Sequence, residues 1–128
     1  MFQNFQVNTI VPDVEPCVGF YLALGFAETY RFPAEGIPEH VEVRANGLTL
    51  GISSAAAAQE VHDLAIGDGG NAVHLCLWCD DIDATYAAML AAGGRTFREP
   101  RDFQDGRLRN GWVRDPGGNL VELVEQRK

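Results

Sequence analysis

The sequence has few basic residues and no long hydrophobic run, and each shortage excludes a class of protein. Ten Lys and Arg against 18 Asp and Glu give a formal net charge of -8. This argues against an extended nucleic-acid surface, because such surfaces neutralise phosphates with Lys and Arg. No stretch of about 18 apolar residues and no basic start followed by an apolar core is present. We therefore expect a cytoplasmic protein that binds neither nucleic acid nor membrane.

Cysteine is also scarce. Cys17, Cys76 and Cys79 make an odd number, which is typical of reduced thiols rather than of a disulfide framework. Cys76 and Cys79 have the spacing of half a zinc motif, but no second pair follows them. A chain of 128 residues can bury about two thirds of its unfolded surface, so neither a disulfide nor a metal is needed to hold the fold.

The sequence does contain an arrangement that occurs twice. A strand, a helix and three strands are indicated in each half, with a polar and alanine-containing linker over 54–70. Asp13 and Gly25 mark the start and end of the first helix. They fall on Asp81 and Gly93, each 68 residues later. Such an internal repeat predicts the organisation of the whole chain.

The predicted fold is α+β, with two tandem βαβββ modules over 1–53 and 71–128 in a single domain covering 1–128. Each module leaves one face of a curved sheet to be covered, and pairing of the modules would form a cup with one small-molecule site. The expected strands cover 5–11, 26–32, 40–44, 48–53, 72–79, 95–99, 107–114 and 119–126.

The repeat also singles out polar residues. Gln6 falls on His74 in the first strands of the two halves, and Gly51 falls on Glu122 in the last strands. Glu122 stands between apolar residues on one strand face, where a carboxylate needs a partner or a metal. Two simpler interpretations stay open: His74 as a core histidine bonded to a carbonyl, and Glu122 as a carboxylate paired with an arginine.

Three segments, "VPDVEPCVGFYLALGF", "HLCLWCDDIDATYAAMLAAGG" and "DPGGNLVELVE", resemble the vicinal oxygen chelate superfamily, which includes glyoxalase I, bleomycin-resistance proteins, extradiol dioxygenases and certain epimerases. The resemblance covers nearly the whole chain. It is most specific in the second half, where a D-P-x-G-N-x-x-E-L pattern occurs and a His lies seven residues before the Asp that caps the helix. It implies the glyoxalase/bleomycin resistance/dioxygenase fold.

The resemblance also implies a metal site. In metal-binding members the ligands lie on the first and last strands of each half, which here gives Gln6, Gly51, His74 and Glu122. Gly51 has no side chain, which departs from the glyoxalase I pattern. The implied set is therefore Gln6, His74 and Glu122, suited to Ni, Zn, Fe, Co or Mn, with Glu122 also moving a proton. A site that has lost its metal is the equal alternative.

Other residues are assigned around this site. Trp78, Asn110 and Trp112 are expected to contact the ligand, because aromatic walls stack planar or apolar molecules; ordinary core aromatics are the alternative. Six of the ten basic residues lie in 95–114, where an arginine could hold an anionic substrate, although a solvated segment is the simpler interpretation. His40 and His62 lie outside the repeat and are expected to face solvent.

Two functions follow. The first is a divalent-metal-dependent lyase, isomerase or dioxygenase acting on a small oxygen-chelating substrate. The second is a metal-free protein that binds and sequesters a drug or metabolite, as bleomycin-resistance proteins do. Retention of His74 and Glu122 favours the enzyme, whereas Gly51 and the two tryptophans favour the binding protein. A homodimer is expected in either case.

Overall fold

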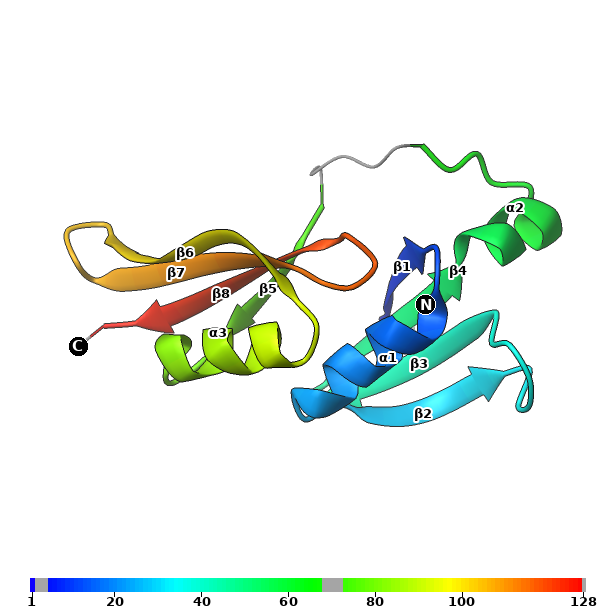
Figure 1. The fold of residues 1–128 in the computed structure, drawn as a ribbon, viewed down its shortest axis with the longest axis horizontal. Coiled ribbons are helices and arrows are strands. Elements are labelled where there is room, and N and C mark those ends of the chain that lie inside the picture. Colours follow the sequence, from blue (N-terminus) through cyan, green and yellow to red (C-terminus); the bar gives the residue numbers. More distant parts are fainter. Residues whose placement is uncertain (2–4, 68–72, 128) are drawn as a thin grey trace. The chain divides into compact units, whose positions relative to one another are not determined.

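The computed structural model describes residues 1, 5–67 and 73–127, and the chain divides into two compact units, Met1–Gly69 and Gly70–Lys128 (Figure 1). The first unit contains β1 (Val7–Val11), α1 (Val14–Ala23), β2 (Ala27–Phe32), β3 (His40–Ala45), β4 (Leu48–Ser54) and α2 (Ala55–His62). The second contains β5 (Leu75–Trp78), α3 (Ile82–Ala91), β6 (Arg95–Phe103), β7 (Leu108–Arg114) and β8 (Leu120–Gln126).

The two units have the same sheet topology. The strand order is β1-β4-β3-β2 in the first and β5-β8-β7-β6 in the second. In each unit the first strand pairs parallel with the last, and the other neighbours pair antiparallel. The predicted α+β class and the two tandem βαβββ modules are therefore confirmed.

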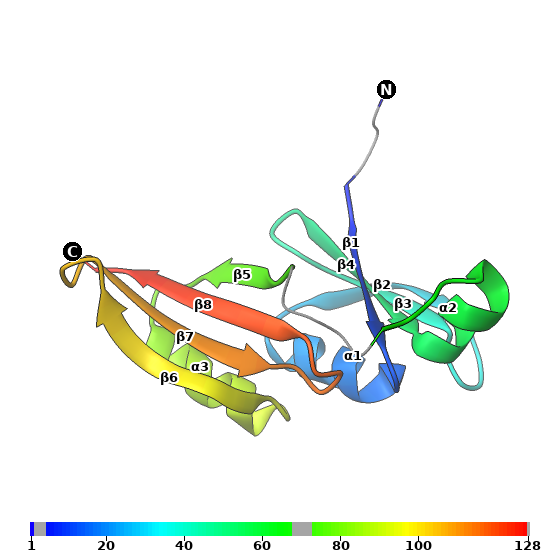
Figure 2. The ribbon, with the colours of Figure 1, turned by 90° about the horizontal axis from the view of Figure 1, so that it is seen from above.

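Each sheet packs one face against its own helix. In the first unit, α1 lies over one face of β3 and β4 (Figure 1). The Phe20 and Tyr21 side chains of α1 are fully buried. In the second unit, α3 lies along one face of the sheet (Figure 2) and buries Ile82 and Met89. The opposite faces carry the polar residues, since side chains alternate along a strand.

The ends of the two repeated helices show how far the repeat extends. Gly25 and Gly93 both adopt positive φ, of 100° and 106°, as the predicted helix ends require. Asp81 caps α3 by accepting a hydrogen bond from the backbone of Ala84 at 3.0 Å. Asp13 occupies the equivalent position before α1 but makes no side-chain capping bond.

Two segments differ from the expectation. The segment 54–70, expected to be a linker, contains a helix of eight residues, because the Ser54 hydroxyl caps it and an alanine run follows. β6 continues through Pro100, which an edge strand tolerates, and Gly111 opposite leaves room for the proline ring. No helix in the described part of the chain is long and apolar enough to cross a membrane.

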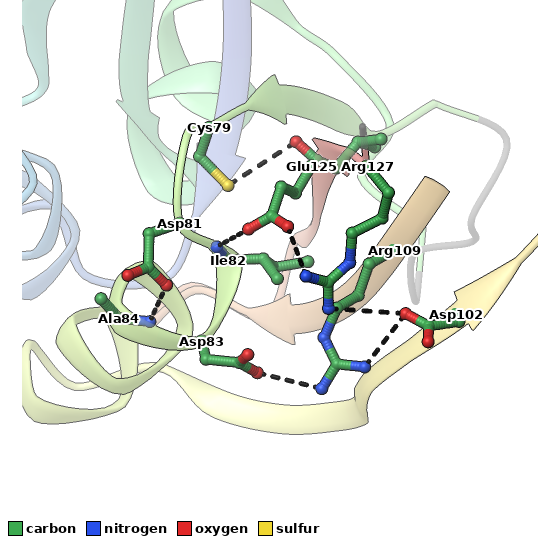
Figure 3. Close-up of polar contacts among 10 residues, drawn as sticks. Cys79, Asp81, Ile82, Asp83, Ala84, Asp102, Arg109, Glu125 and Arg127 are labelled. Carbon is green, nitrogen blue, oxygen red and sulfur yellow. Dashed lines mark hydrogen bonds and ion pairs between the residues drawn. The ribbon is translucent and has the colours of Figure 1, made fainter. Parts of the chain in front are cut away.

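Charged residues tie α3 to the sheet of the second unit (Figure 3). The Glu125 carboxylate accepts the backbone N–H of Ile82 at 2.8 Å. Arg109 bonds to Asp83 at 3.1 Å and to Asp102 at 3.3 Å. Arg109 therefore has protein partners, and these bonds favour a structural role over the anion-binding one considered for its segment.

Candidate functional site

The second unit brings together four residues that the sequence had singled out. Glu122 Oε1 lies 3.1 Å from His74 Nε2, and Glu122 Oε2 accepts a 3.1 Å hydrogen bond from the Asn110 amide. The His74 and Trp112 rings meet edge to face, with centroids 4.7 Å apart. The His74 and Glu122 side chains keep exposed fractions of 32% and 15%, so a small solute can reach them.

Strand register explains this meeting. β8 is the second strand of its sheet, between β5 and β7, and Glu122 pairs with Cys76 on one side and with Trp112 on the other. The turn between β7 and β8 fixes that register. Its Asp115 is buried and accepts the backbone N–H groups of Gly117 and Asn119 at 3.0 and 2.9 Å.

The Cys76 thiol lies beside this carboxylate. Partial desolvation, together with the negative charge of Glu122, raises the pKa of the Cys76 thiol to about 11. The thiol is therefore protonated at neutral pH. Because metals and electrophiles react with the thiolate, Cys76 is neither a ready ligand nor a ready nucleophile.

The first unit contains a separate polar cluster on its sheet. Glu42 Oε2 accepts hydrogen bonds from Gln6 at 3.0 Å and from His40 Nε2 at 2.8 Å, and His40 Nδ1 lies 2.7 Å from Ser53 Oγ. The His40 bond, assisted by the Gln6 bond, holds the pKa of the Glu42 carboxyl below its usual value despite the opposing effect of burial. The expectation that His40 faces solvent was wrong, because both ring nitrogens are bonded and the side chain is 23% exposed.

Gly51 lies at the centre of that cluster. It pairs with Glu42 across the β3–β4 ladder. A Cβ atom on Gly51 would lie 2.1 Å from Asn8 Oδ1 and 2.8 Å from His40 Cε1. The absence of a side chain at Gly51 is thus what allows Asn8 and His40 to approach the sheet.

Comparison of the ladders shows how the two clusters correspond. In the second unit the carboxylate of Glu122 in β8 is bonded by His74, which immediately precedes β5, and by Asn110 in β7. In the first unit the carboxylate of Glu42 is bonded by Gln6 from the first-strand side and by His40 in β3. The two partners keep equivalent positions, whereas the carboxylate has moved from the last strand to the strand beside it.

A cavity of about 390 Å³ lies next to the cluster of the first unit. The polar part of its wall is formed by Asn8, Glu39, His40, Ser53 and His62, and the other lining residues are apolar. Helix α2 contributes Ala57 and Ala58 to the lining. This volume is within the range of small-molecule pockets.

The match to a known family covers both units. The model of the Glyoxalase/Bleomycin resistance protein/Dioxygenase superfamily matches residues 5–123. The chain belongs to this superfamily. Membership agrees with the family suggested by the sequence motifs, and it places both polar clusters within a superfamily domain.

Individual relatives match the chain at modest sequence identity. The chain is 33% identical over 79 residues to a probable lactoylglutathione lyase of Vibrio cholerae, and the match covers 59% of this chain and 57% of that protein. A hypothetical protein from S. aureus has a TM-score of 0.81 at 23% identity, covering 98% of this chain and 95% of that one. A glyoxalase-related enzyme from Fulvimarina pelagi has a TM-score of 0.80 at 22% identity, covering 98% and 89%. At these identities the two structures show a shared superfamily fold.

Gln6 and Trp78 are the other two residues predicted for the site. Gln6 lies in the first unit and bonds to Asn8 as well as Glu42. Trp78 is 64% exposed on the second unit, so it is not a core aromatic. Among the described residues no group of three or more His, Cys, Asp or Glu side chains is placed to hold a metal ion. His40, Glu42 and Ser53 were missed, although the alternation of His40 and Glu42 along one strand was a usable signal.

Proposed function

We propose that this superfamily member is a divalent-metal-dependent lyase or isomerase that acts on a small molecule with vicinal oxygens. The observation that carries the proposal is the convergence of the His74 imidazole and the Glu122 carboxylate, 3.1 Å apart, on one partly exposed sheet face. The lyase names of the curated relatives support the reaction class.

The donor set fits a divalent transition metal. A neutral imidazole nitrogen and a carboxylate oxygen are ligands that Zn, Ni, Fe, Co and Mn accept. Asn110 holds the other oxygen of Glu122, and such outer hydrogen bonds orient metal-binding carboxylates. His74 and Glu122 supply two ligands, and the assignment of Gln6 as a third stays a prediction.

When bound, the metal would act as a Lewis acid that polarises a substrate carbonyl. In this proposal the Glu122 carboxylate also accepts and returns a substrate proton, with Asn110 fixing its orientation. The Trp112 ring beside His74 forms an apolar wall for the substrate. The exposed Trp78 ring is proposed as a second contact for the substrate.

Metal content tests this proposal directly. Untagged protein, purified without chelator, is analysed by elemental mass spectrometry beside an H74A/E122A double variant. The matched control is E60A/H62A, which removes the same two residue types from exposed positions of α2. We expect about one equivalent of metal in wild type and control, and a loss in H74A/E122A. Absence of metal from all three after incubation with Ni, Co, Zn, Mn or anaerobic Fe(II) would refute the proposal.

The cavity of the first unit favours a second candidate function, the binding of a small apolar molecule. Its volume of about 390 Å³ and its apolar lining support this candidate. An Ala57→Phe variant would fill the cavity from α2. Ligands that raise the melting temperature of the wild type but not of this variant would support binding there, and equal stabilisation of both would count against it.

A further inference from the structure

The first unit contains an arrangement that the proposed metal chemistry does not use. Ser53, His40 and Glu42 form a continuous chain of hydrogen bonds, with 2.7 Å between Ser53 Oγ and His40 Nδ1 and 2.8 Å between His40 Nε2 and Glu42 Oε2. A hydroxyl, an imidazole and a carboxylate joined in this order are the components of an activated nucleophile. We propose that Ser53, activated by His40 and Glu42, is a nucleophile that accepts acyl groups from small apolar esters.

The direction of the hydrogen bonds follows from the carboxylate. An ionised carboxylate can only accept, so His40 Nε2 carries a proton and donates it to Glu42. In the neutral imidazole this leaves a lone pair on Nδ1, and the Ser53 hydroxyl donates to it. His40 therefore lies where it can take the Ser53 proton. The ring nitrogens have exchanged roles relative to serine proteases, where Nε2 faces the serine, but both nitrogens can accept a proton.

The cavity indicates which substrates can reach the nucleophile. Ser53 and His40 both lie on the wall of the 390 Å³ cavity, whereas Glu42 does not. Ile10, Phe32 and Val61 give much of the remaining lining an apolar character. Ser53 is one residue before the cap of α2, and such strand-to-helix junctions hold the nucleophile in α/β-hydrolases. The cavity thus suits a short apolar acyl chain.

The proposed reaction is ester hydrolysis in two steps. Ser53 Oγ bonds to the ester carbonyl carbon while its proton passes to His40 Nδ1, and the alcohol leaves with that proton. Water then attacks the acyl-serine and gives a proton to His40, which returns it to Ser53 Oγ as the acid departs. The net change is ester plus water to acid plus alcohol.

The sequence offers a clean test because Ser53 and Ser54 are the only serines. Ser54 is the matched control, since its hydroxyl instead caps α2 through the Ala57 N–H. The protein is treated with an alkyl fluorophosphonate in EDTA and followed by intact mass. We expect one adduct in wild type and S54A, with fluoride displaced, and none in S53A.

Activation is tested separately from accessibility. H40A is expected to slow the labelling rate about 100-fold, the scale of a lost general base, whereas E60A, at an exposed position of α2 outside the cavity lining, is expected to leave it unchanged. E42Q, which keeps the shape of Glu42, is expected to slow labelling at least about tenfold and supports the inference if H40A fails to fold. The rate of p-nitrophenol release from p-nitrophenyl butyrate should likewise fall in H40A and in E42Q.

Two results would overturn the inference. One is the absence of an adduct on folded wild-type protein, with folding verified by circular dichroism. The other is equal labelling of wild type, E42Q and H40A, which would show that Ser53 is merely accessible. The EDTA keeps this result independent of the proposed metal site, because loss of metal at His74 and Glu122 leaves the predicted labelling unchanged.

Discussion

Replacing Asp115 with Ala should destabilise the second unit by about 2–4 kcal/mol. Asp115 is 1% exposed, and its Oδ1 atom accepts the backbone N–H groups of Gly117 and Asn119 at 3.0 and 2.9 Å. Each hydrogen bond to a charged group contributes about 1.5–3 kcal/mol. We place the total below the full sum for two bonds because the turn residues are partly exposed and water can replace part of the loss.

The two tryptophans make this prediction measurable on one unit. Both Trp78 and Trp112 lie in the second unit, so urea unfolding followed by tryptophan fluorescence reports its stability. D115N retains an acceptor oxygen and should cost about half as much as D115A, because uncharged hydrogen bonds are weaker. Asp80→Ala, at an exposed position, should stay within about 0.5 kcal/mol of wild type. Equal losses in D115N and D115A would refute the hydrogen-bond reasoning.

Three further predictions follow. The pKa of Glu42 is lowered in the folded state, so the ionised carboxylate stabilises the fold above the unfolded pKa, and this stabilisation is lost as the pH falls through the folded pKa. Below about pH 4.5, the urea midpoint measured by circular dichroism should therefore fall more in wild type than in E42Q. Gly51→Ala should cost about 1 kcal/mol by the same method, since overpacking is partly relieved by movement of exposed Asn8, and no cost would contradict the close packing. A homodimer should sediment at about twice the 14.0 kDa of one chain, and a 14.0 kDa species at micromolar concentration would exclude it.

Much of the fold was predictable because its signals are local. Gly25 and Gly93 end equivalent helices, and the alternation of apolar residues in β3, β4, β7 and β8 marks the faces that meet the helices. The extension of β6 was not predictable in the same way, since it depends on the contact of Pro100 with Gly111 across the ladder. Such a contact requires the register of two strands, which the sequence of either strand alone does not specify.

The two candidate sites also differ in whether the sequence predicts them. The resemblance to the superfamily implied that His74 and Glu122 belong to one site, at positions that the repeat had singled out, and the structure brings the two residues together. The Glu42 cluster could not be found by that reasoning, because its carboxylate lies in β3 and has no counterpart at the equivalent position of β7. Comparison of the two halves identifies polar residues at equivalent positions, and it does not identify a carboxylate such as Glu42 that only one half has.

The absence of a side chain at Gly51 explains why the carboxylate lies on different strands in the two units. A carboxylate side chain at Gly51 would occupy the space that Asn8 and His40 now fill. With that space open, a carboxylate at Glu42 can bond to His40 from the neighbouring strand, and His40 is then held against Ser53. The second unit retains a carboxylate on its last strand and has Val124 where the first has Ser53. The lack of a side chain at Gly51 therefore distinguishes the second unit, which presents the proposed metal ligands, from the first unit, which presents a hydroxyl, an imidazole and a carboxylate in a hydrogen-bonded chain.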